Sequence, residues 1–254
     1  MNISLLQTDI KWADPVFNRS HIEKLLEKLP KTDLVVLPEM FTTGFCNSPK
    51  ELAEQTNSTT LLWMQEMAKC KDCAITGSIA INADGEYYNR MYFVMPDGSH
   101  YFYDKRHLFT YGGEHKQYIA GKNKLIVEYK GFRILLLICY DLRFPVFSRN
   151  KGDYDLVVYV ANWPIARIHV WDILLKARAI ENQSYVAGVN RVGQDPSSNY
   201  CGASSIVDFF GNEIGRDETS KECFISAELD LEKLNKFRQK FPFLNDADSF
   251  DLIG

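Results

Sequence analysis

Short hydrophobic runs alternate with amphipathic segments along the whole chain. Residues 18–29 place Ile22, Leu25 and Leu29 on one stripe, at the spacing of an α-helix that buries one face. Residues 132–138 are almost entirely apolar, which is typical of a strand covered on both faces of a sheet. The same pattern predicts further strands at 3–9, 34–37, 74–81, 87–95, 101–104, 156–161 and 185–190, and further helices at 59–69 and 169–182.

Turn-forming residues separate several of these strands. The stretches 83–86 and 96–99 contain Asp-Gly pairs that predict tight connections, and residues 210–212 predict a hairpin. No linker rich in Pro, Gly or Ser, no low-complexity segment and no repeat divides the 254 residues. The alternation of strands and helices without a break predicts a single α/β domain.

Three reactive side chains stand just beyond predicted strands. Cys139 directly follows the strand at 132–138. Glu39 follows Pro38, which ends the preceding run because proline has no N–H for a central ladder. Lys105 follows an aromatic strand in the same way. Chemistry in covered sheets gathers where strands end and the chain turns, so these positions form a candidate catalytic set.

Each of the three residues also has an ordinary structural explanation. Cys139 alone would fit an inert buried thiol, Glu39 a surface carboxylate, and Lys105 a solvated turn. A thiol, a carboxylate and an ammonium at three strand ends are much less expected by chance. A lysine beside the thiol is further predicted to lower the thiol pKa and to stabilise an oxyanion in the same site.

Six stretches carry a more specific signal. They are Leu37-Pro38-Glu39, residues 104–109, Gly112-Gly113-Glu114, residues 139–145, residues 161–164 and residues 177–182. Together they resemble the nitrilase, or carbon–nitrogen hydrolase, superfamily, whose catalytic set is Glu-Lys-Cys. In that family the stretch that resembles residues 112–114 carries a second active-site glutamate.

The resemblance covers almost the whole chain, from the first predicted strand to about Asp230. It implies a four-layer α-β-β-α sandwich of the nitrilase type. It also implies a carbon–nitrogen hydrolase domain over residues 1–234. Residues 235–254 then form a C-terminal extension that packs on the body or on a partner subunit.

The resemblance and the demands of amide chemistry together imply a role for each candidate. An amide carbonyl is a poor electrophile, and its nitrogen must leave protonated. Cys139 is therefore expected to be the nucleophile and Glu39 the general base. Lys105 and the backbone N–H of Tyr140 are expected to stabilise the oxyanion, while Glu114 positions the substrate and Lys105. No metal or organic cofactor is expected.

Residues 140–150 and 162–190 look most like bacterial omega-amidases, which hydrolyse the terminal amide of 2-oxo-acid amides. The expected substrate is therefore a short 2-oxo dicarboxylate mono-amide, of the 2-oxoglutaramate or 2-oxosuccinamate type, which releases ammonia. The alternatives are a deaminated glutathione amidase, a carbamoyl-amine hydrolase or a nitrile hydrolase. A non-catalytic binding protein on the same scaffold is less favoured, because binding alone does not require the four catalytic residues.

A free carboxylate on the substrate calls for a cation in the pocket. Arg167 is the preferred clamp, because its planar guanidinium suits bidentate binding, although an arginine at a helix start can simply be solvated. Tyr140 and Trp163 are expected to wall the pocket. Arg143 is instead assigned to a structural ion pair with Asp141 or another acid.

Charge and cysteine content narrow the classes of partner. The formal charge is 29 − 33 = −4, which provides no basic field for nucleic acid or anionic lipid. No run is long enough to span a membrane, and the first residues lack the features of a signal peptide. We expect a cytoplasmic homodimer that acts on a small-molecule amide. Cys70 and Cys73 form a C-x-x-C, but without a second pair at zinc-ligand spacing a helix-to-strand connection is favoured.

Overall fold

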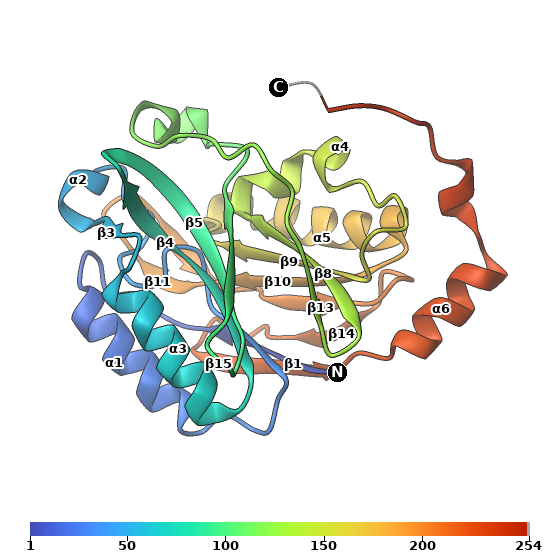
Figure 1. Ribbon diagram of the computed structural model, residues 1–254, viewed down its shortest axis with the longest axis horizontal. Helices are drawn as coiled ribbons and strands as arrows, with labels where there is room; N and C mark the ends of the chain where they lie inside the picture. The colour runs from blue at the N-terminus through green and yellow to red at the C-terminus, as the bar shows by residue number, and fades with distance from the viewer. Residues whose placement is uncertain (253–254) are drawn as a thin grey trace.

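Two β-sheets pack face to face in the computed structural model, which describes residues 1–252 (Figure 1). The first sheet has the order β15-β1-β2-β4-β5-β6, with β3 paired to β4. Its strands are β1 (Asn2–Gln7), β2 (Leu34–Val36), β3 (Glu54–Gln55), β4 (Ala74–Ala83), β5 (Glu86–Val94), β6 (His100–Asp104) and β15 (Cys223–Glu228). Parallel pairs β1–β2 and β2–β4 place β2 inside this sheet.

The second sheet has the order β14-β13-β10-β9-β8-β7. Its strands are β7 (Ile126–Tyr129), β8 (Phe132–Ile138), β9 (Leu156–Ala161), β10 (Tyr185–Asn190), β13 (Ser205–Val207) and β14 (Glu213–Arg216), and a separate ribbon pairs β11 (Val192–Gln194) with β12 (Asn199–Cys201). β8, β9 and β10 run parallel, and β9 and β10 are buried throughout. The apolar run at 132–138 is thus confirmed as an inner strand.

Helices cover the outer face of each sheet. α1 (Pro15–Leu26) and α3 (Thr59–Lys71) cover the first sheet and α5 (Ile168–Asn182) covers the second. The other helices of the described residues are α2 (Pro49–Leu52), α4 (Pro145–Ser148) and α6 (Leu231–Lys240). In β2, Leu34 and Val36 join the core between the sheets, whereas Val35 joins the core beneath α1 and α3. This alternation buries both faces of the first sheet, and α5 covers the second sheet from the other side (Figure 1). The predicted four-layer α-β-β-α sandwich is confirmed.

The first helix differs from its predicted bounds of 18–29. It begins at Pro15, because the Asp14 carboxylate accepts the backbone N–H of Phe17 at 3.0 Å and proline fits the first helical position. It ends at Leu26. The apolar stripe shows which face of the helix packs on the sheet. It does not show where the helix starts, because the start is set by the capping residues.

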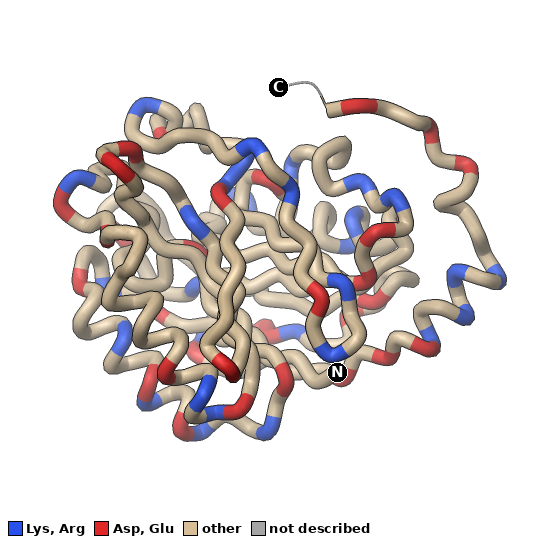
Figure 2. Tube along the Cα trace, in the orientation of Figure 1, with Lys and Arg blue, Asp and Glu red and all other residues tan. Residues whose placement is uncertain are grey.

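Helix α6 crosses the predicted boundary between residues 234 and 235. Leu234 is fully buried, and Arg238 donates to Asp155 Oδ1 at 2.7 Å and to the carbonyl oxygens of Tyr154 and Gln183. The basic positions along α6 are blue in the tube of Figure 2. After α6 the chain runs along the periphery of the molecule (Figure 1), where the Lys151 Nζ donates to the Phe250 carbonyl at 2.9 Å.

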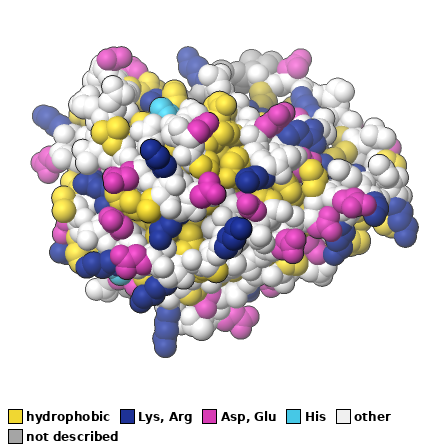
Figure 3. Space-filling model, turned by 60° about the horizontal axis from the view of Figure 1, so that its bottom comes forward, with side chains coloured by type: hydrophobic (Ala, Val, Ile, Leu, Met, Phe, Trp, Pro, Cys, Tyr) yellow, Lys and Arg dark blue, Asp and Glu magenta, His cyan; other side chains and the backbone are white. Residues whose placement is uncertain are grey.

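Charged side chains of both signs are interspersed on the face shown in Figure 3, and neither sign forms a continuous patch there. This agrees with the small net charge of −4. Among the described residues, no helix is both long enough and apolar enough to cross a bilayer.

Arg238→Ala is expected to lower the free energy of unfolding by about 1–3 kcal/mol, because it removes a partner from the buried Asp155. Burial alone would raise the pKa of Asp155, but hydrogen bonds from Arg133 and Arg238 hold that pKa below its ordinary value. The stability gained this way is present above the unfolded-state pKa of about 3.9 and is lost as pH falls through the folded-state pKa.

The difference in free energy of unfolding between the wild type and Arg238→Ala, measured by urea unfolding, should therefore be largest at neutral pH and become smaller below about pH 4. Lys236→Ala serves as the matched control, because Lys236 forms an exposed ion pair with Glu232 on the same helix. An equal effect of both variants at neutral pH would contradict a specific role for the Arg238–Asp155 contact.

Candidate active site

The three predicted strand-end residues converge on one cavity of about 540 Å³. Glu39 follows β2, Lys105 follows β6 in the same sheet, and Cys139 follows β8 in the facing sheet. Glu39 and Lys105 are buried, whereas Cys139 is partly exposed. The face-to-face packing of the sheets thus brings together side chains from positions far apart in the sequence, as predicted.

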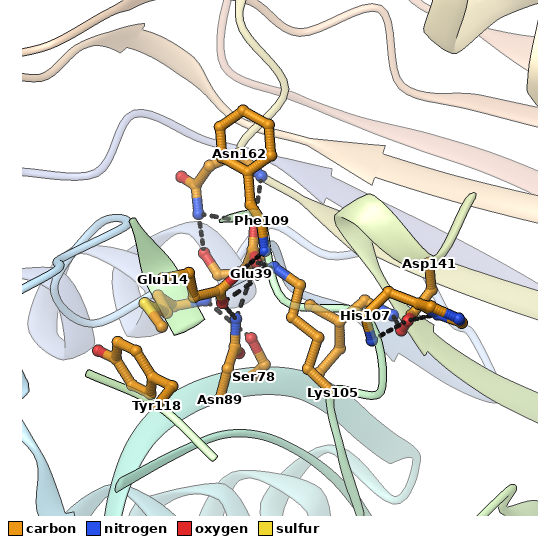
Figure 4. Close-up of polar contacts among 12 residues, drawn as sticks. Glu39, Ser78, Asn89, Lys105, His107, Phe109, Glu114, Tyr118, Asp141 and Asn162 are labelled. Carbon is orange, nitrogen blue, oxygen red and sulfur yellow. Dashed lines mark hydrogen bonds and ion pairs between the residues drawn. The ribbon is translucent and has the colours of Figure 1, made fainter. Parts of the chain in front are cut away.

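Lys105 lies between two buried carboxylates (Figure 4). Its Nζ is 2.9 Å from Glu39 Oε1, 2.9 Å from Glu114 Oε2 and 3.1 Å from Glu114 Oε1. Burial alone would lower the pKa of Lys105, but the charges of Glu114 and Glu39 outweigh it and raise that pKa. With Lys105 written as an ammonium and both glutamates as carboxylates, the formal charge of the three side chains is +1 − 2 = −1.

Glu114 reaches Lys105 through a short turn in the chain. Gly113 adopts φ +80°, a left-handed conformation that suits glycine, and the chain doubles back so that the Phe109 N–H donates to Glu114 Oε2 at 2.6 Å. Burial raises the pKa of Glu114; the charge of Lys105 opposes this rise and that of Glu39 adds to it. Glu114 therefore belongs to the same electrostatic unit as Glu39.

Cys139 occupies a strained position at the end of β8. Its φ of +44° is left-handed, which is uncommon for a residue with a side chain. The turn is held by the buried Asp141 carboxylate, which accepts the N–H of Ile138 at 2.9 Å and the hydroxyl of Tyr103 at 2.8 Å. Asp141 also accepts the backbone N–H of His107 at 2.9 Å, which links this turn to the loop after Lys105.

Lys105 acts on the thiol pKa in the predicted direction, but other effects are larger. The pKa of Cys139 is raised well above its ordinary value, first by burial and next by the charge of Glu39, and Lys105 acts to lower it. Lys105 is also paired with two carboxylates. The sequence identified the lysine beside the thiol but not the burial of the thiol or the acidic side chains around it.

Two asparagines that the sequence did not single out also hold Glu39. The Asn162 N–H donates to Glu39 Oε2 at 2.9 Å, and its side-chain Nδ2 donates to the Glu39 carbonyl at 2.6 Å. Asn89 Nδ2 donates to Glu39 Oε1 at 2.8 Å and to Glu114 Oε1 at 3.2 Å. Asn162 lies in the resembling segment 161–164, whereas the only signal for Asn89 was a polar residue in the middle of a hydrophobic strand.

The predicted substrate-binding residues Tyr140, Trp163 and Arg167 all line the cavity. Trp163 Nε1 donates to the Arg167 carbonyl at 2.8 Å, and the Arg167 guanidinium lies 5.3 Å from the Phe109 ring centroid. Within residues 1–252, the Arg167 guanidinium forms no ion pair with an acidic side chain.

Arg143 does not form the predicted ion pair with Asp141. The Asp141 carboxylate is occupied by Tyr103, His107 and Ile138, and Arg143 instead lines the cavity with its guanidinium 5.2 Å from the Trp163 ring centroid. In the part of the chain described, no acid pairs with Arg143 either. The cavity wall therefore carries two guanidinium groups that have no acidic partner among residues 1–252.

The described residues contain no metal-binding cluster. Over residues 1–252, no cluster of three or more His, Cys, Asp or Glu side chains is arranged to hold a metal ion. Cys70 is exposed on α3 and Cys73 is buried at the start of β4, and both are free thiols. They lie at the predicted helix-to-strand connection.

The sequence profile of the carbon-nitrogen hydrolase family matches this chain over residues 2–239. The chain belongs to that family. It is 46% identical over 254 residues to the omega-amidase YafV of Yersinia enterocolitica, with 100% of this chain and 99% of that protein covered. It is 37% identical over 251 residues to the 2-oxoglutaramate amidase of Bacillus subtilis, with 96% of each covered.

A solved family structure has the same fold. XC1258 from Xanthomonas campestris, a CN-hydrolase superfamily protein with an arsenic adduct in its active site, superposes with a TM-score of 0.96. It is 44% identical, and the match covers 99% of this chain and 98% of that one. The predicted membership of the nitrilase superfamily is thus confirmed.

Proposed function

We propose that this carbon–nitrogen hydrolase is an omega-amidase. Its substrate is a short 2-oxo dicarboxylate mono-amide of the 2-oxoglutaramate or 2-oxosuccinamate type, and its products are the dicarboxylic acid and ammonia. The observation that carries the proposal is the buried Glu39–Lys105–Glu114 network beside Cys139, at a cavity that also holds Arg143 and Arg167. The omega-amidase and 2-oxoglutaramate amidase among its relatives support the substrate class.

Acylation begins with the neutral thiol that the raised pKa favours. As the Cys139 Sγ bonds to the amide carbon, the S–H bond breaks and Glu39 accepts the proton. The C=O bond opens to an oxyanion, which Lys105 and the Tyr140 N–H stabilise. One such donor typically contributes about 2.7–4 kcal/mol to transition-state stabilisation.

Collapse of the tetrahedral intermediate completes the exchange of bonds. The oxyanion re-forms the carbonyl, the C–N bond breaks, and the proton on Glu39 passes to the departing nitrogen to give ammonia. Water then attacks the Cys139 thioester while Glu39 accepts one of its protons, and that proton returns to the thiol as the acid leaves. Electrons are neither gained nor lost overall, so we propose no cofactor.

The two guanidiniums account for the substrate class. A 2-oxo acid presents a carboxylate at the end away from the amide, and arginine binds such a group through two parallel hydrogen bonds. Arg167 was the expected clamp, and Arg143 now joins it as a candidate because both line the same cavity and neither pairs with an acid in the described part of the chain. Tyr140 and Trp163 supply the apolar wall between clamp and thiol.

Other reactions of the family use the same chemistry at the thiol. A deaminated glutathione amidase, a carbamoyl-amine hydrolase and a nitrile hydrolase therefore remain the alternatives, and ammonia release across these substrates separates them. A non-catalytic binding protein is disfavoured, because burying a lysine between two carboxylates is costly and serves no purpose in simple binding.

A homodimer, the division between residues 1–234 and 235–254, and a cytoplasmic location stay predictions. Support for a dimer comes from α5, whose outer face exposes Ile173 and Ile180, and from Phe243 beyond α6, which is 60% exposed. We propose that the segment after α6 packs with this surface against a partner subunit.

Cys139→Ala is expected to leave a folded protein without measurable amidase activity, because it removes the nucleophile and little volume. Iodoacetamide should inactivate the wild type with its adduct on Cys139, whereas chelators should have no effect. Activity would be followed as ammonia release from 2-oxoglutaramate, and folding by circular dichroism. Full activity in the alanine variant would exclude the proposed thioester.

Glu39→Gln and Lys105→Ala are each expected to slow acylation by at least about 100-fold while the protein remains folded, since general acid–base help is typically worth about 100- to 10,000-fold. Single-turnover mixing that follows the acyl-enzyme by mass spectrometry isolates this step. An unchanged acylation rate in either variant would remove that residue from the mechanism.

Arg167→Ala and Arg143→Ala are each expected to lower kcat/KM for 2-oxoglutaramate by about 10- to 150-fold, from the loss of a charge-assisted hydrogen bond worth about 1.5–3 kcal/mol. An uncharged amide of equal length is the control substrate and should change little. Equal losses on both substrates would assign the arginine a structural role, and a wild-type preference for nitriles or carbamoyl amines would overturn the omega-amidase proposal.

A further inference from the structure

Most carboxylate oxygens of the Glu39–Glu114 pair have no room for another proton. Glu39 Oε1 accepts from Lys105 Nζ at 2.9 Å and Asn89 Nδ2 at 2.8 Å, and Glu114 Oε1 accepts from the same two groups at 3.1 and 3.2 Å. Glu114 Oε2 accepts from Lys105 Nζ at 2.9 Å and the Phe109 N–H at 2.6 Å. A carboxylate oxygen offers about two lone pairs, so these three oxygens are filled.

Glu39 Oε2 is the exception. It accepts one short hydrogen bond, from the Asn162 N–H at 2.9 Å, while the Asn162 side-chain Nδ2 lies farther away, at 3.4 Å. The second lone pair of Oε2 is engaged only by this longer contact, so Oε2 is the oxygen of the pair that is most open to a proton. Glu39 and Cys139 line the same cavity, so this oxygen belongs to the carboxylate beside the nucleophile.

Asn89 bridges the Oε1 atoms of Glu39 and Glu114. It is fully buried in β5, and its single amide nitrogen supplies one hydrogen to each carboxylate. Asn89 Oδ1 has no hydrogen-bond partner within the described chain, so the side chain is oriented by the carboxylates. The Asn89 carbonyl also accepts the Lys105 backbone N–H at 2.9 Å, so Asn89 contacts both carboxylates and the backbone of the lysine between them.

We propose that Asn89 is a positioning residue that holds both Oε1 atoms as acceptors and thereby directs the Cys139 proton to Glu39 Oε2. The inference rests on the proposed role of Glu39 as general base. In the step concerned, the S–H bond breaks, the Oε2–H bond forms, and the same proton later goes to the leaving nitrogen. Without the amide, the two Oε1 atoms share only Lys105, and a proton held between the carboxylates would disable the base.

The pH dependence of acylation reports this role. Hydrogen bonds donated to a carboxylate favour its charged form, so their loss lets the Glu39–Glu114 pair take up a proton at higher pH. The limb on which the rate falls with falling pH should then move upward. The titratable and charged groups that face this pair from the surrounding elements are Lys105, Tyr118, Cys46, Cys139, Arg143 and Arg167, and all of them are unchanged in the variants below.

Asn89→Leu removes both donors at similar volume, and Asn89→Asp keeps the shape but replaces the donor with an acceptor. We expect the acid-limb midpoint of single-turnover acylation by 2-oxoglutaramate to rise by about one pH unit or more in each, which is about tenfold in rate below the midpoint. Thermal unfolding of both variants checks that they fold, and the isosteric aspartate keeps the test available if leucine does not.

Ser78→Ala is the matched control. Ser78 is equally buried, and its Oγ accepts the N–H of Met40 next to Glu39 at 3.0 Å, but it bonds neither carboxylate. Ser78→Ala should change the acylation rate by the same factor at every pH and leave the midpoint in place. A midpoint that stays in place in folded Asn89 variants would overturn the inference, whereas undiminished acylation in Glu39→Gln would overturn the proposed function on which it rests.

Discussion

The site depends on one buried ammonium shared by two buried carboxylates. Lys105 lies within about 3 Å of Glu39 and Glu114, and none of the three is accessible to solvent. Charges removed from water are tolerated only when they are paired and their remaining hydrogen-bonding atoms are satisfied. The backbone N–H groups of Phe109 and Asn162 and the amide of Asn89 meet this requirement. Every element that supplies one of these donors must therefore be correctly placed.

The sandwich supplies that precision. β2, β5 and β6 belong to one sheet: Glu39 follows β2, Asn89 lies within β5 and Lys105 follows β6. In the facing sheet, Cys139 follows β8 and Asn162 follows β9. Both sheets bury apolar side chains between them, so the relative position of the two strand sets is set by packing over a large area. Groups carried by rigid strands hold their geometry better than groups on loops.

The net negative charge of the network also shapes the chemistry. A lysine with no acidic partner would favour a standing thiolate, but the paired Lys105 leaves the Cys139 pKa raised. Under the proposed mechanism, the thiol keeps its proton until attack on the amide, when Glu39 accepts it. The protonated Glu39 then supplies the proton that the departing nitrogen requires.

Sequence predicted the parts of the site that coincide with a change of pattern. Cys139 and Glu39 stand where an apolar run stops, and that boundary is visible without coordinates. Asn89 could not be recognised, because its importance comes from two acceptors on other elements. Arg143 was misassigned for a similar reason: Asp141 is adjacent in sequence, but its carboxylate is taken by Tyr103, His107 and Ile138.

The charged network and the two cavity guanidiniums lie on different segments, although Arg143 shares its turn with Cys139. The charged network is held at strand ends between two sheets, whereas Arg143 and Arg167 lie in short 3₁₀ turns, Cys139–Arg143 and Ile165–Arg167, at the cavity wall. Turns at a surface tolerate substitution better than buried strands. Under the proposed function, a change of substrate would replace side chains such as Arg167 and leave the hydrogen bonds among Glu39, Lys105 and Glu114 intact.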